Sequence, residues 1–168
     1  MRESAKALKK IYNTTPIRAM ECGVADGKNA KILMDNFRIS EFILIDNWLL
    51  EYSEHAGNWL IETKTKFQNK KPVKIIISDA LSCVDMFPQK YFNYIYLDDC
   101  HSPDHVFAEI TKYWDKVVKG GILAGHDYTA NSPERVAWAV QKFCRETGNK
   151  YYHKMNDNEK VEDWWIIK

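Results

Sequence analysis

Short apolar segments typical of buried strands alternate with amphipathic segments typical of helices, and this alternation limits the possible folds more than any other feature. Residues 41–46 (EFILID) form a nearly continuous apolar run, as expected of a parallel strand that is buried on both faces. The preceding segment, residues 27–37, has apolar residues at the i, i+3, i+4 and i+7 spacing of a helix face. The alternation predicts an α/β fold with a mostly parallel sheet.

Applied to the whole chain, the pattern predicts five strand–helix units and a closing hairpin. The expected strands are 17–23, 41–46, 73–78, 91–98, 122–127 and the hairpin pair 151–155 and 164–168. The first three expected helices are 3–13, 27–37 and 54–67. A fourth begins at Ser102-Pro103, has Val117 on its apolar face and is broken by Gly120-Gly121. A fifth follows Ser132-Pro133. Serine suits the N-cap and proline the first helical position. We therefore expect one domain over residues 1–168, with a mostly parallel seven-stranded sheet and an antiparallel C-terminal hairpin strand.

The composition excludes several classes of protein. A chain of 168 residues suits a single domain. Its 24 Lys and Arg against 23 Asp and Glu give a net charge of +1, which provides no general attraction to nucleic acid or anionic lipid. No segment has the length of an apolar membrane span, and the N-terminus lacks the apolar core of a signal peptide. Its four cysteines show no Cys-x-x-Cys spacing, and free thiols in the cytoplasm are the simplest account.

A glycine-containing loop follows the first predicted strand, with the sequence ECGVADG at 21–27. In open parallel sheets, ligands bind at the carboxyl ends of the strands, so polar residues there are the candidates for a site. A dinucleotide fingerprint counted from Gly23 would need glycine at Ala25 and Lys28, and both positions fail. The loop is therefore either a ligand-binding turn of another kind or an ordinary glycine turn.

Two acidic residues follow the next two strands. Asp46 ends the second strand, 19 residues after Gly27, where an acid can accept hydrogen bonds from both hydroxyls of a ribose. Asp79 and Ala80 follow the third strand, where a side chain can reach an adenine. Both aspartates have a simpler interpretation, because Asp is common as the cap of a turn.

The fourth and fifth strands end in acid–histidine pairs, which are Asp98 with His101 and His126 with Asp127. Strand order in this architecture brings both pairs to one place. Carboxylates there could hold a hard cation such as Mg²⁺, and a histidine beside an acid could serve as a general base. A pair of satisfied polar caps is the alternative.

Taken together, these residues resemble a class I S-adenosylmethionine-dependent methyltransferase, which has a Rossmann-like fold. The motif Glu21-x-Gly23-x-Ala25-x-Gly27 is similar to the acidic first motif of that family, with alanine at its middle glycine. The resemblance implies that S-adenosylmethionine binds over this loop. It also implies contacts of Asp46 with the ribose and of Asp79 and Ala80 with the adenine, with Asp98 at the cofactor as well.

The stretch from Tyr94 to Tyr128 resembles a narrower subgroup, the methyltransferase-24 type of small-molecule O-methyltransferases. It implies methyl transfer to a hydroxyl of a sugar or a phenol-like acceptor, with His101 as the general base and Asp98 and His126 beside it. Some members use Mg²⁺, whose ligands here would be Asp98, Asp127 and His126, the histidine standing where an oxygen ligand is usual. The base-methylating motif Asp/Asn-Pro-Pro-aromatic is missing after the fourth strand, which argues against nucleic acid as substrate.

Two other functions stay open at this stage. One is an NAD-dependent oxidoreductase, against which the missing glycines argue. The other is a non-catalytic domain that binds a nucleoside cofactor or a partner. A chain of this length could also be the catalytic core of a homo-oligomer. Trp48, Tyr52 and Trp59, after the second strand, either stack on an acceptor or pack the next helix onto the sheet.

Overall fold

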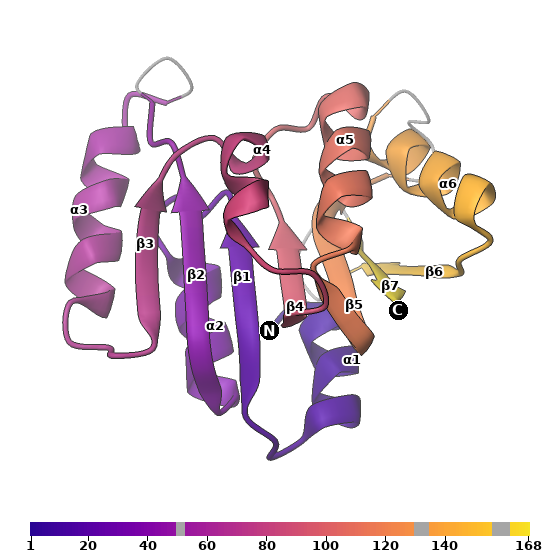
Figure 1. Cartoon of the computed structure of the whole chain (residues 1–168). Helices are drawn as coiled ribbons and strands as arrows, with labels where there is room; N and C mark the ends of the chain where they lie inside the picture. Colours follow the sequence, from indigo (N-terminus) through magenta and orange to yellow (C-terminus); the bar gives the residue numbers. More distant parts are fainter. Residues whose placement is uncertain (50–52, 130–134, 156–161) are drawn as a thin grey trace.

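Seven strands form one sheet in the computed structural model, which describes residues 1–49, 53–129, 135–155 and 162–168 (Figure 1). The strand order is β3-β2-β1-β4-β5-β7-β6, and β7 is antiparallel to both of its neighbours. The strands are β1 (Ile17–Cys22), β2 (Ile39–Asp46), β3 (Val73–Ile77), β4 (Phe92–Leu97), β5 (Val117–Tyr128), β6 (Tyr151–Met155) and β7 (Glu162–Ile167). The predicted fold class is therefore confirmed, including the antiparallel hairpin strand.

Helices cover both faces of this sheet (Figure 1). They are α1 (Glu3–Tyr12), α2 (Lys28–Asn36), α3 (Ala56–Phe67), α4 (Ala80–Cys83), α5 (Pro103–Trp114) and α6 (Val136–Thr147), with a 3₁₀ turn at Val84–Met86. One hydrophobic core joins the sheet to α1, α2 and α3, and the other joins it to α4, α5 and α6. None of the helices in the described segments has the length and hydropathy of a membrane span.

Residues of β2 show why the central strands are apolar throughout. Phe42 and Leu44 are buried in the core on the α1–α3 side, whereas Ile43 and Ile45 are buried in the core on the α4–α6 side. Successive side chains of a strand point to opposite faces. The part of a central strand that lies between two helical layers therefore needs apolar residues at successive positions, as residues 42–45 show.

The structure corrects the predicted boundary between α5 and the fifth strand. Helix α5 ends at Trp114, and Val117, which we assigned to its apolar face, is the first residue of β5. The pair Gly120-Gly121 does not break a helix but lies inside this strand, where Gly120 has a φ of +78° and the register with β4 shifts. Strand propensity and packing thus outweigh the helical spacing of Val117. The pair Ser132-Pro133 lies outside the described residues, and the short α4 was not predicted.

The strand order reverses between β1 and β4, because β2 and β3 lie on one side of β1 while β4 and β5 lie on the other. The ends of β1 and β4 are joined by a hydrogen bond from the Asp98 N–H to the Cys22 carbonyl, at 2.8 Å. Ligands of open α/β sheets bind in the crevice outside the carboxyl ends at this switch point. The glycine loop and the Asp98 segment are therefore the place to look for a site.

Candidate active site

The loop between β1 and α2 depends on two glycines with left-handed backbone. Gly23 has a φ of +78° and Gly27 a φ of +77°. A Cβ atom on Gly23 would lie 2.0 Å from the carbonyl oxygen of Asp98, so any side chain would collide with the end of β4. Glycine at position 23 thus lets the loop pass directly beside the β4 end, and the two candidate segments touch.

Asp46 holds this loop in place through its carboxylate. Oδ2 accepts hydrogen bonds from the Val24 and Ala25 N–H groups at 2.8 and 2.9 Å, and Oδ1 accepts one from the Trp48 N–H at 2.7 Å. Ala25, at the middle glycine position of the motif, has a φ of +47°. Its carbonyl accepts hydrogen bonds from the Trp48 indole and the Thr63 hydroxyl, both at 2.9 Å, so three hydrogen bonds, including that of its own N–H, hold this alanine.

Glu21 is the acidic residue of the same motif, and it is buried, with 2 % of its surface exposed. Its Oε2 has no hydrogen-bond partner among the described residues. Burial, together with the nearby Asp98 charge, raises the pKa of Glu21 to about 8. A buried carboxyl with one unpartnered oxygen marks a place where a polar or cationic ligand group would be favoured.

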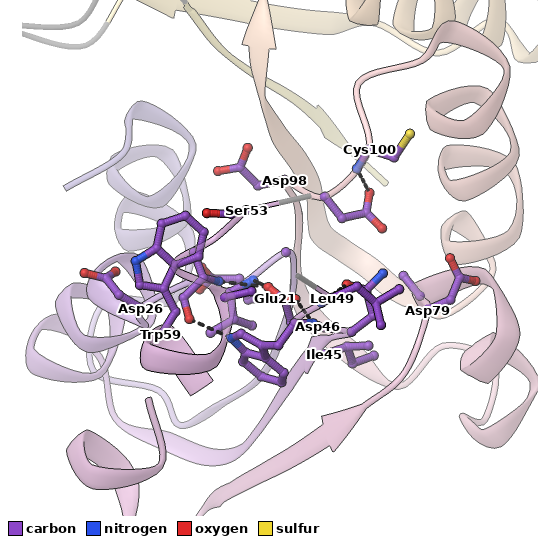
Figure 2. A pocket seen from close by; sticks show the side chains of 18 of the residues that line it. Glu21, Asp26, Ile45, Asp46, Leu49, Ser53, Trp59, Asp79, Asp98 and Cys100 are labelled. Carbon is purple, nitrogen blue, oxygen red and sulfur yellow. Dashed lines mark hydrogen bonds between the residues drawn. The ribbon is translucent and has the colours of Figure 1, made fainter. Parts of the chain in front are cut away.

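A cavity of about 780 Å³ opens in front of these segments, a volume typical of a small-molecule site (Figure 2). Figure 2 shows Glu21 and Asp46 in the middle of the view, Asp98 above them, and Asp79 and Trp59 to either side. Asp79 also caps α4, because its Oδ1 accepts a hydrogen bond from the Ser82 N–H at 2.9 Å. The lining includes every predicted cofactor residue except Gly27, namely Glu21, Gly23, Ala25, Asp46, Asp79, Ala80 and Asp98.

The histidine–acid pairs at the ends of β4 and β5 lie together. The His101 Nε2 atom is 3.1 Å from Asp127 Oδ2 and 3.6 Å from Asp98 Oδ1. The His126 Nδ1 atom is 3.3 Å from Asp127 Oδ2 and 3.8 Å from Asp98 Oδ1. The sequence predicted this convergence from strand order alone, and each imidazole faces both carboxylates.

The surroundings of these four side chains shift their pKa values in different directions. The hydrogen bond to Asp98 raises the pKa of His101 above its usual value. Burial opposes the charged form of His126, but the carboxylates of Asp127 and Asp98 outweigh it and raise that pKa as well. Burial raises the pKa of Asp98, whereas the hydrogen bond from His126 lowers that of Asp127. The side chain of His101 is 48 % exposed, and it lines the cavity, so it is the histidine that a ligand can reach.

A family profile described as a methyltransferase domain, the methyltransferase-24 family, matches residues 20–128. The chain belongs to this family. The matched residues run from β1 to the end of β5 and include the glycine loop and both histidine–acid pairs. A search of the curated proteins by sequence found no match.

Solved structures with a similar fold include several methyltransferases. Fibrillarin from Aeropyrum pernix, with natively bound S-adenosyl-L-methionine, has a TM-score of 0.70 at 13% identity, covering 98% of this chain and 73% of that one. Precorrin-6y C5,15-methyltransferase from Geobacter metallireducens has a TM-score of 0.70 at 12% identity, covering 98% and 88%. An rRNA methylase from Streptococcus thermophilus has a TM-score of 0.67 at 15% identity, covering 98% and 93%. At these identities the likeness concerns the fold.

Arg2 lines the same cavity but was not predicted from the sequence. Its guanidinium lies 3.7 Å from Asp98 Oδ2 and 5.7 Å from the centre of the Tyr96 ring, and Arg2 lines the cavity. No motif surrounds it in the sequence. It reaches the site because α1 packs against the sheet next to β5 and β7, a tertiary contact without a local signal.

The aromatic residues after β2 have different surroundings. Trp48 is buried in the core on the α1–α3 side, and Trp59 is partly buried against the same core. Both also line the cavity. Tyr52 lies outside the described residues.

The histidine–acid group was also predicted to bind Mg²⁺ through Asp98, His126 and Asp127. Mg²⁺ prefers oxygen ligands and octahedral geometry, whereas here each carboxylate faces imidazole nitrogens. The set of ligand atoms that Asp98, His126 and Asp127 offer therefore does not fit Mg²⁺.

Proposed function

We propose that this methyltransferase transfers a methyl group from S-adenosylmethionine to a hydroxyl group of a small molecule. The observation that supports it best is the position of His101, an exposed imidazole held by two carboxylates at a cavity that the glycine loop forms. A hydroxyl acceptor needs a group that removes its proton, and a histidine paired with acids is suited to that task.

S-adenosylmethionine would be held by the residues around the loop. The missing Cβ at Gly23 leaves room for close approach to the backbone, and the unpartnered Oε2 of Glu21 is available to a cationic amino group. Asp46 retains free lone pairs for ribose hydroxyls, since three backbone N–H groups use only part of its capacity. Asp79 and Ala80 line the far part of the cavity, where an adenine would lie.

His101 would act as the general base. With its Nε2 proton directed at Asp127, the Nδ1 atom is the nitrogen that can accept a proton from the acceptor. Asp98 and Asp127 stabilise the imidazolium that forms, and His126 completes the group from the β5 side. The cofactor supplies an activated methyl group on its sulfonium, so the protein mainly has to align the acceptor oxygen with it.

The acceptor would be a small hydroxylated compound such as a sugar or a phenol. The balanced net charge of +1 offers no electrostatic attraction to a nucleic acid. The segment after β4, Asp98-Asp99-Cys100-His101, also differs from the Pro-Pro-aromatic motif of base N-methylation.

The test is to incubate the protein with methyl-labelled S-adenosylmethionine and a panel of sugars and phenols, and to detect methylated product by mass spectrometry. We expect His101→Ala to lower kcat by about 100-fold or more, the range for loss of a general base. S-adenosylhomocysteine should still bind to this variant. His153→Gln, on β6, is the matched histidine control and should keep full turnover. Full turnover in both His101→Ala and Asp98→Ala would show that the assigned base is wrong.

A further inference from the structure

A second group of ionisable side chains lies behind the end of β4, and the proposed methyl transfer does not use it. Asp99 follows β4, while His105 and Glu109 lie one helical turn apart on α5, at the i and i+4 spacing that brings two side chains to one face. Asp99 Oδ2 is 3.5 Å from His105 Nε2, and His105 Nε2 is 3.9 Å from Glu109 Oε2. Two carboxylates and one imidazole, from a loop and a helix, thus lie close together.

The buried members of this group lack the partners that buried polar atoms normally have. The Glu109 side chain is 1% exposed, and neither of its carboxylate oxygens has a hydrogen-bond partner among the described residues. The same is true of His105 Nε2. Across the described segments, no lysine or arginine forms an ion pair with Asp99 or Glu109. His105, when protonated, is the one cationic side chain that the described residues place beside these two carboxylates, so the group keeps an excess negative charge that a bound cation would neutralise.

The separations between the three side chains suit a metal ion. One ligand atom from each of Asp99, His105 and Glu109 lies within 4.8 Å of the others. A tetrahedral ion with ligands at 2.0–2.2 Å holds its ligand atoms about 3.3–3.6 Å apart. The two separations from His105 Nε2, 3.5 Å to Asp99 and 3.9 Å to Glu109, are close to that range.

We propose that Asp99, His105 and Glu109 bind a divalent transition-metal cation such as Zn²⁺, with a fourth coordination position open to the cavity. Two carboxylates and one imidazole neutralise the +2 charge of the ion, and the imidazole nitrogen favours Zn²⁺ over Mg²⁺. The fourth position opens to the cavity because Asp99 and His105 both line it. The bound ion would join the segment after β4 to α5.

A metal at this place would also act on the neighbouring site. The segment that carries Asp98 and His101 leaves β4 beside Asp99, and Cys100 makes a backbone N–H hydrogen bond to the Asp99 carboxylate. Anchoring Asp99 to α5 therefore restrains the backbone on both sides of it. The ion would stabilise the fold and this loop whether or not the methyl acceptor is a hydroxyl.

The experiment measures Zn²⁺ binding to the full chain by calorimetry after the protein has been treated with a chelator. We expect about one tightly bound Zn²⁺ at this site, and binding of Mg²⁺ that is at least about 100-fold weaker. The variants Glu109→Gln and His105→Gln keep the size and polarity of the side chain. They should weaken Zn²⁺ binding by more than about 100-fold, a larger loss than follows when a residue that only hydrogen-bonds to a metal ligand is changed. Asp127→Asn, in the histidine–acid group at β5, is the matched control and should keep the Asp99 site.

Two results would overturn the proposal. One is the absence of stoichiometric Zn²⁺ binding to the wild-type protein, as expected if Asp99 and Glu109 instead share a proton. The other is Zn²⁺ binding that survives in Glu109→Gln and His105→Gln but is lost in Asp127→Asn, which would assign the ion to the other group. Should both variants unfold, imidazole ¹⁵N resonances of the wild-type protein decide, since Zn²⁺ must shift those of His105.

Discussion

At the scale of single residues, the left-handed alanine in the glycine loop leads to a direct prediction. Ala25 has a φ of +47°, a conformation that costs an L-residue roughly 1–2 kcal/mol. Ala25→Gly should therefore raise the free energy of unfolding by up to about 1 kcal/mol, after the greater chain entropy of glycine is subtracted. Ala7→Gly in α1 is the control and should lower it by about 1 kcal/mol. Urea denaturation of both variants measures the difference, and a destabilised Ala25→Gly would contradict the expectation.

Glu21 gives a prediction about pH, because burial raises its pKa to about 8 in the folded protein. A carboxyl with a raised folded-state pKa favours the folded state at low pH, and this contribution is lost as the pH rises toward 8. The Glu21→Gln variant lacks the contribution. Its stability relative to the wild type should therefore increase between pH 5 and pH 8, as measured by chemical denaturation at several pH values. A difference that does not change with pH would rule out an ionising, buried Glu21.

The proposed base gives a second prediction about pH. Because the hydrogen bond to Asp98 raises the pKa of His101, the neutral imidazole is lost at a higher pH than for an ordinary histidine. The rate of methyl transfer should fall as the pH drops, with the midpoint above about 6.5. In Asp98→Asn the midpoint should move to lower pH, because the stabilising carboxylate is gone. The pH profile of kcat at saturating substrate checks this, and an unmoved midpoint would assign the titration to another group.

At the scale of elements, a buried group ties α1 to β7 and β4. The Asp163 carboxylate accepts hydrogen bonds from the Ser4 N–H at 2.8 Å and the Ser4 hydroxyl at 2.7 Å. It also accepts one from the Tyr96 hydroxyl at 2.7 Å. Asp163→Ala leaves the buried Ser4 N–H and Tyr96 hydroxyl without a partner, whereas the Ser4 hydroxyl keeps the Tyr94 hydroxyl at 2.8 Å. The variant should therefore cost about 2 kcal/mol or more. Tyr96→Phe, which removes one donor, should cost about 1 kcal/mol.

Hydrogen exchange separates a local effect of this change from a global one. In Asp163→Ala, the amides of α1 should lose more protection than those of β1, because α1 depends on this contact for its attachment. Equal loss in both elements would mean that the carboxylate supports the whole sheet instead.

Elements with a strong period could be read from the sequence, while those shaped by tertiary contacts could not. Strand β2 is apolar at successive positions because two helical layers cover it, and this leaves a clear pattern. Val117 fits the spacing of α5 equally well, and only pairing with Phe92 of β4 assigns it to a strand. Strand order places the ends of β4 and β5 side by side, and this brings together Asp98, His101, His126 and Asp127. Arg2 reaches the cavity, and Glu109 reaches Asp99, through tertiary contacts for which the local sequence carries no signal.

At the scale of the whole molecule, cofactor binding should stabilise the fold as a unit. S-adenosylhomocysteine at about 100 times its Kd adds about 2.7 kcal/mol. For 168 residues this is a rise in Tm of roughly 5–10 °C. NADH at the same concentration should produce no rise, because two glycines of the dinucleotide fingerprint are missing. A shift with NADH alone would contradict the proposed cofactor.

The contact between Ser4 and Asp163 also has a consequence for biosynthesis. The two residues are 159 positions apart, so the ribosome adds the aspartate about 8 to 32 s after the serine, at about 5–20 residues per second. During that interval α1 lacks the carboxylate that holds it to the sheet. We expect α1 to be among the last of the helices α1–α6 to dock. Until then the surface of the sheet under α1, which includes Tyr94, stays accessible to chaperones.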